Sequence, residues 1–343
     1  MIRRMDRRVG FLLIVCASAV SATFALANDG AVPQPARHQF TLKDAGSKYR
    51  RDKEVSEVKL SSAQTDGRFS LLDEYWEPGF AVPSHFHKEH AEVFYVLAGQ
   101  VEWTVAGERR VLGPGAMLYI PADTVHSVKV LGTQTYHGLM FSEPGGYEHN
   151  MTREQEYSGQ QRERPEIMKQ LMRLGDFNPA VAAAATPVAH PNADEPQPAR
   201  HHFSMQAAGP TFERDGLVSE VKLSAVQSDG RFSLLDEIWH AGFAVPPHFH
   251  AEHAEVFYIV AGTVEWAVGG ETHRMGPGAT VYIPPDTVHS VKVVGEQDVH
   301  ILMLYEPGGY EYNIEQELEY TKAQREQPDI KKKLRALSDF NAR

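Results

Sequence analysis

The chain has 343 residues, a mass of 38.3 kDa and a formal charge of −11. This length suggests two or three ordinary domains, and the acidic excess argues against binding to nucleic acids or anionic membranes. The single cysteine, Cys16, lies within the first 27 residues, so the rest of the chain has neither a disulfide nor a thiolate metal ligand. Beyond residue 27, no segment is apolar for long enough to cross a bilayer as a helix.

Residues 1–27 have the pattern of an export signal peptide. A basic start precedes the apolar run Phe11–Val20, which is too short to span a bilayer. Ala25-Leu26-Ala27 is a small-x-small cleavage site, so we expect a mature chain that begins at Asn28 with a charge of about −14. We therefore expect a periplasmic or secreted protein with no membrane anchor after cleavage. The pair Arg7-Arg8 leaves both the general secretory and the twin-arginine routes open.

The remaining sequence contains two copies of one unit at a constant offset of 163 residues. Asp66–Glu74 returns as Asp229–Glu237, for example, and the same offset relates the copies throughout. Because each copy has the size of a typical domain, we expect a signal peptide at 1–27, a first domain at 28–178 and a second at 199–343. Residues 179–198 are rich in alanine and proline, a composition typical of a semi-stiff linker.

Each copy is expected to consist mainly of strands. Segments rich in β-branched and aromatic residues alternate with glycine-containing turn signals, and they predict strands over 55–60, 69–76, 92–97, 101–105, 117–120 and 127–131. Many short strands at regular spacing favour a small barrel or sandwich. The end of each copy, 152–174 and 315–337, instead has apolar residues at helical spacing. Pro165 and Pro328 are expected to divide each end into two helices that cover a barrel face or the other domain.

Each copy also carries a set of candidate metal ligands. They are His85, His87, Glu92 and His126, repeated as His248, His250, Glu255 and His289. His85 and His87 are two apart on a predicted strand, so their side chains share a face. A bend after His87 would let Glu92 join them from the next strand, and a closed barrel would bring His126 from a third.

Such ligand sets predict one divalent transition metal ion per domain. Neutral imidazoles and one carboxylate suit Fe, Mn, Ni, Cu, Co or Zn. Four protein ligands leave coordination positions free for water, substrate or dioxygen. One carboxylate on a divalent ion leaves a positive site, which we expect to attract an enolate or a carboxylate.

The ligand spacing resembles that of the cupin family. Gly79-x5-His85-x-His87-x4-Glu92-x6-Gly99 matches the first cupin motif at every fixed position, and 242–262 matches it again. The second motif fits at Gly115, Pro121 and His126, with the same match 163 residues later. The resemblance implies an all-β protein of two tandem cupin barrels, of the double-stranded β-helix or jelly-roll type, each with a short C-terminal helical segment.

Two positions of the second motif depart from the family pattern. Asp123 and Asp286 stand where glycine is usual, and Val130 and Val293 where asparagine is usual. None of these is a ligand position, so the departures bear on the shape of the loop and not on the metal site.

Two-domain cupins of this length resemble the quercetinase-type dioxygenases. By that resemblance the histidines hold the metal, while Glu92 and Glu255 bind it and act as catalytic bases toward a substrate hydroxyl. We therefore expect a metal-dependent oxidoreductase, a dioxygenase that uses dioxygen on an enolisable or phenolic, flavonol-like small molecule.

Two other functions stay open. An oxalate-decarboxylase-like enzyme, acting on a small carboxylate, would need an acid on a mobile lid and an arginine that grips the substrate. We find no such lid, and no arginine near the first motif that repeats in both halves. A non-enzymatic metal- or sugar-binding cupin is also compatible with two near-identical halves. Assembly into a homo-oligomer stays open as well.

Weaker candidates surround the predicted ligands. Glu89 and His90 lie in the bend between ligands, where a solvated turn is the simpler interpretation. His137 could reach the cavity or be an ordinary core residue, and Glu74 could support the ligands from behind. All four residue types recur 163 positions later.

Overall fold

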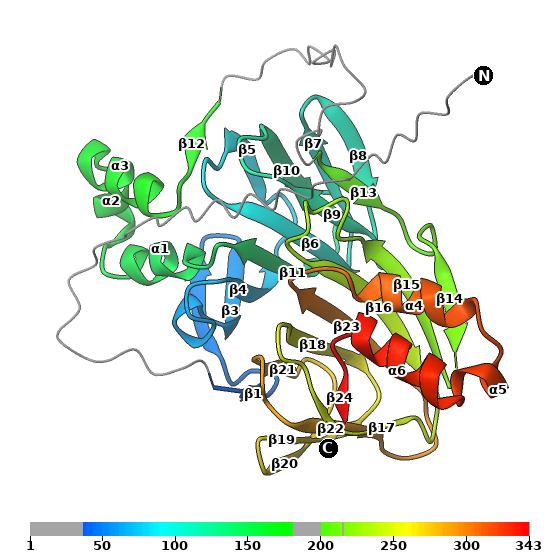
Figure 1. Cartoon of the computed structure of the whole chain (residues 1–343). Coiled ribbons are helices and arrows are strands. Elements are labelled where there is room, and N and C mark those ends of the chain that lie inside the picture. The colour runs from blue at the N-terminus through cyan, green and yellow to red at the C-terminus, as the bar shows by residue number, and fades with distance from the viewer. Residues whose placement is uncertain (1–36, 181–199, 215, 343) are drawn as a thin grey trace, which may run out of the picture. The chain divides into compact units, whose positions relative to one another are not determined.

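The computed structural model describes residues 37–180, 200–214 and 216–342 (Figure 1). The expected signal peptide and nearly all of the expected linker lie outside these residues. The described residues belong to one compact unit. Within the described ranges, no helix is both long and apolar enough to cross a membrane.

Both copies fold mainly into strands, as expected. The first copy contains β1 (Gln39–Thr41), β2 (Ser47–Arg51), β3 (Glu54–Leu60), β4 (Ser70–Trp76), β5 (Ala81–Phe86), β6 (Ala91–Ala98), β7 (Val101–Val105), β8 (Glu108–Leu112), β9 (Met117–Ile120), β10 (His126–Val130), β11 (Tyr136–Glu143) and β12 (Asn178–Pro179). The second contains β13 (His202–Ser204), β14 (Thr211–Arg214), β15 (Leu217–Leu223), β16 (Ser233–Trp239), β17 (Ala244–Phe249), β18 (Ala254–Ala261), β19 (Val264–Val268), β20 (Glu271–Met275), β21 (Thr280–Ile283), β22 (His289–Val293), β23 (Val299–Glu306) and β24 (Asn341–Ala342).

The helical ends differ from the prediction of two helices each. They form α1 (Tyr147–Glu154), α2 (Gly159–Arg162) and α3 (Pro165–Leu174), then α4 (Tyr310–Leu318), α5 (Lys322–Arg325) and α6 (Pro328–Leu337). Pro165 and Pro328 open α3 and α6 in the first turn, where the missing N–H is not needed. The additional break falls at Ser158 and Thr321, whose hydroxyls accept hydrogen bonds from the backbone at the start of α2 and α5.

Each barrel combines a seven-stranded and a five-stranded sheet, which confirms the tandem β-barrel fold. In the first barrel the strand orders are β13-β9-β6-β11-β4-β3-β2 and β12-β5-β10-β7-β8. In the second they are β1-β21-β18-β23-β16-β15-β14 and β20-β19-β22-β17-β24.

The two copies exchange their first strands. β1 of the first copy pairs antiparallel with β21 of the second, and β13 of the second pairs with β9 of the first. The exchange is reciprocal, with Phe40 opposite Val281 and Phe203 opposite Leu118. Each barrel therefore depends on the other copy for one of its strands. The boundaries at 178 and 199 stay a prediction, since the connecting residues lie outside the described part of the chain.

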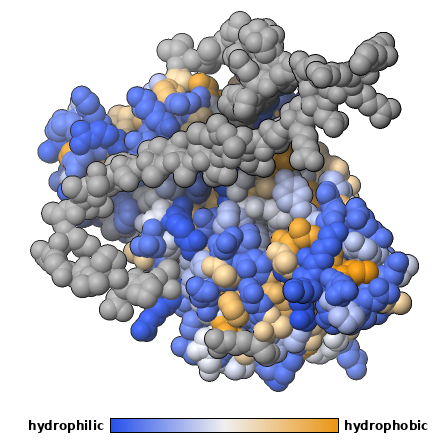
Figure 2. Space-filling model, viewed as in Figure 1, coloured by the Kyte–Doolittle hydropathy of each residue, from blue (hydrophilic) through white to orange (hydrophobic). Residues whose placement is uncertain are grey.

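The seven-stranded sheets are buried on both faces. Along β6, Val93 and Tyr95 point to a core shared by both copies, whereas Phe94 and Val96 point into the first barrel. Successive side chains of a strand point to opposite faces, and both faces are buried here. The strands are therefore almost continuously apolar. Apolar residues thus gather inside and between the barrels, and hydrophilic side chains predominate on the face that Figure 2 shows.

Polar contacts repeated in both directions join the barrels. Arg231 bonds Glu143 and the Tyr119 hydroxyl of the other copy at 2.6 and 3.2 Å, and Arg68 contacts Glu306 and Tyr282 in the same way. His137 also belongs to this interface and not to the barrel cavity. Its Nε2 lies 2.6 Å from Asp73, which accepts a hydrogen bond from the Tyr258 hydroxyl of the second copy.

The shared core should carry much of the stability of the whole unit. Phe69 is fully buried there, with its ring centroid 5.0 Å from that of Phe141 and 5.7 Å from that of Tyr282. We expect Phe69→Ala to lower the free energy of unfolding by about 3–5 kcal/mol, because it removes a large side chain from a packed interface. Urea unfolding measures the loss. Val226→Ala, at a residue that is 76 % exposed, is the control and should change stability by no more than about 0.5 kcal/mol.

Candidate metal centres

In the first barrel the structure brings the four predicted ligands together. His85 lies near the end of β5 and pairs in register with His126, the first residue of β10. A ring nitrogen of each of these residues and of His87 lies within 4.8 Å of the other two. Glu92, on β6, places its two carboxylate oxygens 3.4 Å from His87 Nε2 and 3.2 Å from His126 Nε2.

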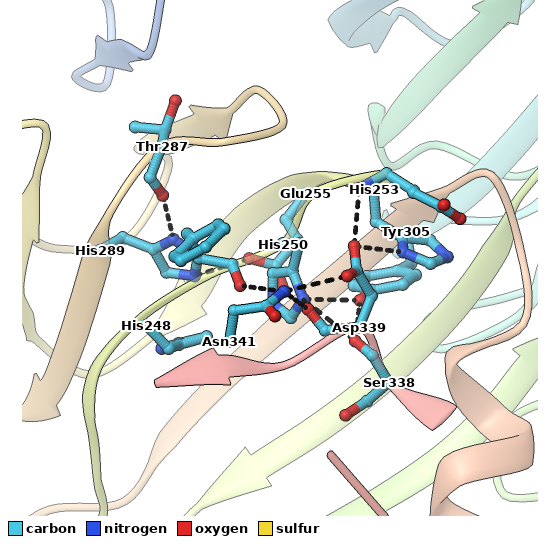
Figure 3. Close-up of polar contacts among 12 residues, drawn as sticks. His248, His250, His253, Glu255, Thr287, His289, Tyr305, Ser338, Asp339 and Asn341 are labelled. Atoms are coloured by element: carbon cyan, nitrogen blue, oxygen red, sulfur yellow. Dashed lines mark hydrogen bonds and ion pairs between the residues drawn. The ribbon is translucent and has the colours of Figure 1, made fainter. Parts of the chain in front are cut away.

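The second barrel repeats the arrangement (Figure 3). One donor atom from each of His248, His250, Glu255 and His289 lies within 4.8 Å of all the others. The Glu255 oxygens lie 3.4 Å from His250 Nε2 and 3.0 Å from His289 Nε2. All eight residues are buried. The predicted ligands therefore form two clusters of four, one in each barrel.

Hydrogen bonds orient the imidazoles for metal binding. In the first cluster, Nδ1 of His85, His87 and His126 lies 2.8–3.0 Å from the backbone carbonyl of Pro83, Asp176 or Thr124, respectively. The second cluster repeats these contacts through the carbonyls of Pro246, Asp339 and Thr287. A carbonyl can only accept, so Nδ1 carries the proton and Nε2 is left with a lone pair that faces the cluster.

The carboxylates show that the clusters suit a cation. Glu92 Oε2 and Glu255 Oε2 are buried, and neither has a hydrogen-bond partner among the described residues, although histidine nitrogens lie close by. A buried carboxylate oxygen without a donor is costly. A divalent ion between the imidazole nitrogens and this oxygen would remove that cost, and the nitrogen and oxygen donors match those of transition metals.

The protonation states of His85, His248 and Glu92 also favour metal binding. Burial and the nearby His126 lower the pKa of His85 to about 4, and burial with His289 does the same for the pKa of His248. Burial alone would raise the pKa of Glu92, but the surrounding imidazoles outweigh it and lower this pKa to about 2. At neutral pH, His85 and His248 are therefore neutral and Glu92 is ionised, as ligands of a transition metal must be.

The unusual aspartates of the second motif preserve the loop. Asp123 and Asp286 adopt φ values of 58° and 59°, the left-handed region that explains the glycine of the family pattern. Aspartate tolerates this region better than most residues. The Asp123 N–H donates to the His87 carbonyl at 2.6 Å, so the loop still contacts the ligand segment that follows β5.

The helical tail of each copy closes over its own metal cluster. The Phe177 ring stacks on the imidazole of His85 with 4.2 Å between centroids, and Phe340 stacks on His248 at 4.1 Å. The carbonyl of Asp176 accepts from His87, and its side chain accepts from the Glu89 N–H at 2.6 Å. The tail therefore contributes to the site itself, which the sequence interpretation missed. The repeated Asp-Phe-Asn after the last helix was the available signal.

The weaker candidates have supporting or separate roles. His90 lies 3.4 Å from the Asp176 carboxylate, so the bend between ligands is attached to the tail instead of being freely solvated. Glu74 is buried and accepts hydrogen bonds from Ser56 and the Trp76 ring, and it does not line the metal cavity. Burial, with the nearby Glu54, raises its pKa well above the usual value, which favours a neutral side chain.

A cavity of about 330 Å³ adjoins the first cluster. His85, His87, Glu92 and His126 form one part of its wall. Most of the remaining wall is aromatic or aliphatic: Trp76, Phe80, Val82, Phe94, Trp103, Val128, Met140, Met168, Leu171, Met172 and Phe177. A smaller polar part contains Arg51, which lies 2.8 Å from Glu54 and 3.3 Å from Glu154. This arginine recurs as Arg214, but its sequence position, well before the first motif, gave no hint that it reaches the cavity.

Removal of one histidine from each cluster tests the assignment. We expect His85→Ala to lose about half of the bound metal, and the His85→Ala/His248→Ala double variant to lose nearly all of it, because each substitution opens one four-ligand site. Metal analysis after dialysis measures this. His137→Ala, which removes a half-buried interface histidine outside both clusters, should keep both ions. Full metal retention in the double variant would show that the ligands are wrong.

The sequence of this chain is similar to those of known proteins. A family model described as "Cupin domain" matches residues 73–152 and 235–305, one match in each barrel. Quercetin 2,3-dioxygenase of Bacillus subtilis is 23 % identical over 261 residues, which cover 72 % of this chain and 76 % of that protein. An uncharacterised protein of Methanocaldococcus jannaschii is 28 % identical over 104 residues, covering 30 % of this chain and 83 % of its own length.

Solved structures agree at the level of the fold. A variant of oxalate decarboxylase from Bacillus subtilis superposes with a TM-score of 0.56 at 16 % identity, covering 82 % of this chain and 79 % of that one. The same enzyme at pH 4.6 gives 0.55 at 14 % identity, covering 86 % and 85 %. With both family matches, both barrels and both ligand clusters in place, the chain is a two-domain member of the cupin superfamily that resembles quercetinase-type dioxygenases.

Proposed function

We propose that this bicupin is an exported, metal-dependent dioxygenase that acts on an enolisable or phenolic, flavonol-like small molecule. The observation that carries the proposal is the cavity beside the first cluster, which joins a mostly aromatic and aliphatic wall to four metal-binding side chains. A planar aromatic compound with a hydroxyl group complements both parts. The relationship to quercetin 2,3-dioxygenase supports the same substrate class.

The residues of the chain divide the chemical tasks. Bound at the cluster, a divalent ion would act as a Lewis acid that polarises a substrate oxygen and makes its hydroxyl more acidic. Glu92 lines the cavity, and a carboxylate that binds the ion through one oxygen keeps the other as a base, so Glu92 is placed to take the hydroxyl proton. The resulting substrate anion is the electron-rich form that dioxygen would oxidise.

The cavity wall contributes orientation and exclusion of water. Phe94, Trp103 and Phe177 offer flat apolar surfaces close to the histidines. A planar ring held against them would present its edge hydroxyl toward Glu92 and would displace water from the cavity. Both effects favour proton transfer from substrate to the glutamate.

An oxalate-decarboxylase-like reaction is the second candidate, because Arg51 and Arg162 line the cavity. An arginine in the wall is what a carboxylate substrate would require. However, the Arg51 guanidinium already contacts Glu54 and Glu154, so two carboxylates balance its charge. This environment favours a neutral phenol over a dianion. A metal- or sugar-binding cupin without catalysis is the third candidate.

Export remains part of the proposal, and its support is the basic, apolar and small-x-small pattern of residues 1–27.

Oxygen uptake with a panel of flavonols and catechols tests the function. We expect Glu92→Gln to slow oxygen consumption by about 100-fold or more, because an amide cannot accept the substrate proton. Glu89→Gln is the matched control, since this exposed side chain lies outside the cavity, and it should keep the wild-type rate. Carbon dioxide release from oxalate without net oxygen use would support the second candidate instead. Bound metal without any turnover would support the third.

A further inference from the structure

We infer that the two metal clusters are unequal: substrate is taken only at the first cluster, and Tyr305 closes the second to substrate while leaving its metal ligands intact. The inference rests on the proposed function for the identity of the substrate. Its structural basis is one replacement beside otherwise matching clusters. Position 142 holds serine in the first copy, and the equivalent position 305 holds tyrosine in the second.

Both residues occupy the same place relative to the ligands. On β11, Ser142 lies opposite Glu92 of β6. On β23, Tyr305 lies opposite Glu255 of β18. Side chains two apart on a strand share a face, so both residues point to the barrel interior with Met140 and Met303, which belong to the interior cores.

Tyr305 packs against His250 of the second cluster, on the Nδ1 side of that ring (Figure 3). The residue is fully buried, and its ring stacks on His253 at 4.5 Å and lies 5.5 Å from the ring of His250. Its hydroxyl donates to the Ser338 carbonyl at 2.9 Å and lies 3.1 Å from His250 Nδ1. Since Nδ1 carries a proton, the tyrosine oxygen can accept from it. The ring is therefore held at both ends and also fixes a metal ligand.

In the first copy the corresponding space is not filled by a ring. Ser142 is buried, and its hydroxyl has no hydrogen-bond partner among the described residues. Among the residues equivalent to the neighbours of Tyr305, His87 and Tyr147 line the cavity beside the first cluster, whereas His90 and Gly175 lie outside it. A tyrosine at position 142 would place its ring between His87 and Tyr147 and reduce the space open to a substrate.

The tail helices also favour binding of an aromatic substrate at the first cluster. In the first copy α3 contributes Met168 and Met172 to the cavity wall. The equivalent residues on α6 are Lys331 and Arg335, and Arg335 lies over the ring of Phe340 at 5.4 Å. Methionines give an adaptable apolar surface for an aromatic molecule, whereas a lysine and an arginine favour solvent.

The ligands themselves do not distinguish the clusters. Both have the same residue types, Nδ1 contacts to equivalent backbone carbonyls and an unpartnered glutamate oxygen, and among the described residues only His250 has further Nδ1 contacts, to the Ser338 carbonyl and the Tyr305 hydroxyl. Both are therefore expected to load metal, and the difference concerns access alone. One substrate should bind per chain even when two ions are present.

Binding of 4-nitrocatechol to cobalt-loaded single-site variants tests access without requiring turnover. His248→Ala keeps only the first cluster and His85→Ala only the second, and metal analysis should give one ion per chain for each. This catechol is planar, chelates metals and has a visible absorption band that changes on coordination. We expect a spectral change with His248→Ala and none with His85→Ala at the same concentration.

Exchange of the tyrosine should transfer access between the clusters. Tyr305→Ser added to His85→Ala should strengthen binding about tenfold or more, whereas Ser142→Tyr added to His248→Ala should weaken it by a similar factor, since a large side chain added to a packed site competes with a ligand for space. Tyr305→Phe keeps the ring and should leave the second cluster closed. Ser142→Ala should leave the first cluster open.

The outcomes separate this inference from the proposed function. Equal binding by the two single-site variants, no binding by His248→Ala, or a closed second cluster in the Tyr305→Ser variant would overturn the inference. None of these results depends on oxygen uptake. Failure of the wild-type protein to oxidise any flavonol or catechol, with the binding pattern as expected, would overturn the dioxygenase assignment and leave the inequality of the clusters standing.

Discussion

The hydrogen bonds between imidazole Nδ1 atoms and backbone carbonyls are the interaction on which the rest of the site depends. In the first barrel, the three acceptors come from β5, from the loop before β10 and from the tail after α3. Each carbonyl acceptor is therefore positioned by a different element of the barrel. The ligand nitrogens converge only when the barrel is closed and the tail is in place. The geometry needed for metal binding therefore forms together with the folded barrel.

The tail is the least expected of these elements. Its backbone orients His87, its aspartate holds the bend between ligands, and Phe177 covers the His85 ring. The same segment contributes methionines to the cavity wall. A change in the tail would thus alter both the shape offered to a substrate and the orientation of a ligand, which couples specificity to metal binding through one short piece of chain.

Sequence reasoning reached the fold and the ligand sets because both rest on local patterns. Strands such as β7 and β9 follow directly from apolar and β-branched runs between glycine turns, and the ligand spacing repeats in both copies. It did not reach the strand exchange, since β1 is short and nothing in it shows which barrel it joins. It also missed Arg51 and Phe177, because closure of the barrel and docking of the tail bring them to the cavity from distant positions.

The sequence duplication explains why the two clusters have the same ligands. The interface between the barrels leaves the residues beside the clusters free to differ, so the two clusters can differ in function. The shared core uses the outer faces of the seven-stranded sheets and the exchanged strands pair at their edges, so these faces and edges are constrained in both copies. The interior beside Glu92 and Glu255 is not part of that interface. A serine or a tyrosine can therefore stand there without disturbing the contact between barrels, and the tyrosine adds a hydroxyl acceptor for the His250 Nδ1 beside the two backbone carbonyls. In such an arrangement one barrel is free to keep an open cavity, while the other gains rigidity at its metal centre from the side chain that fills the equivalent space.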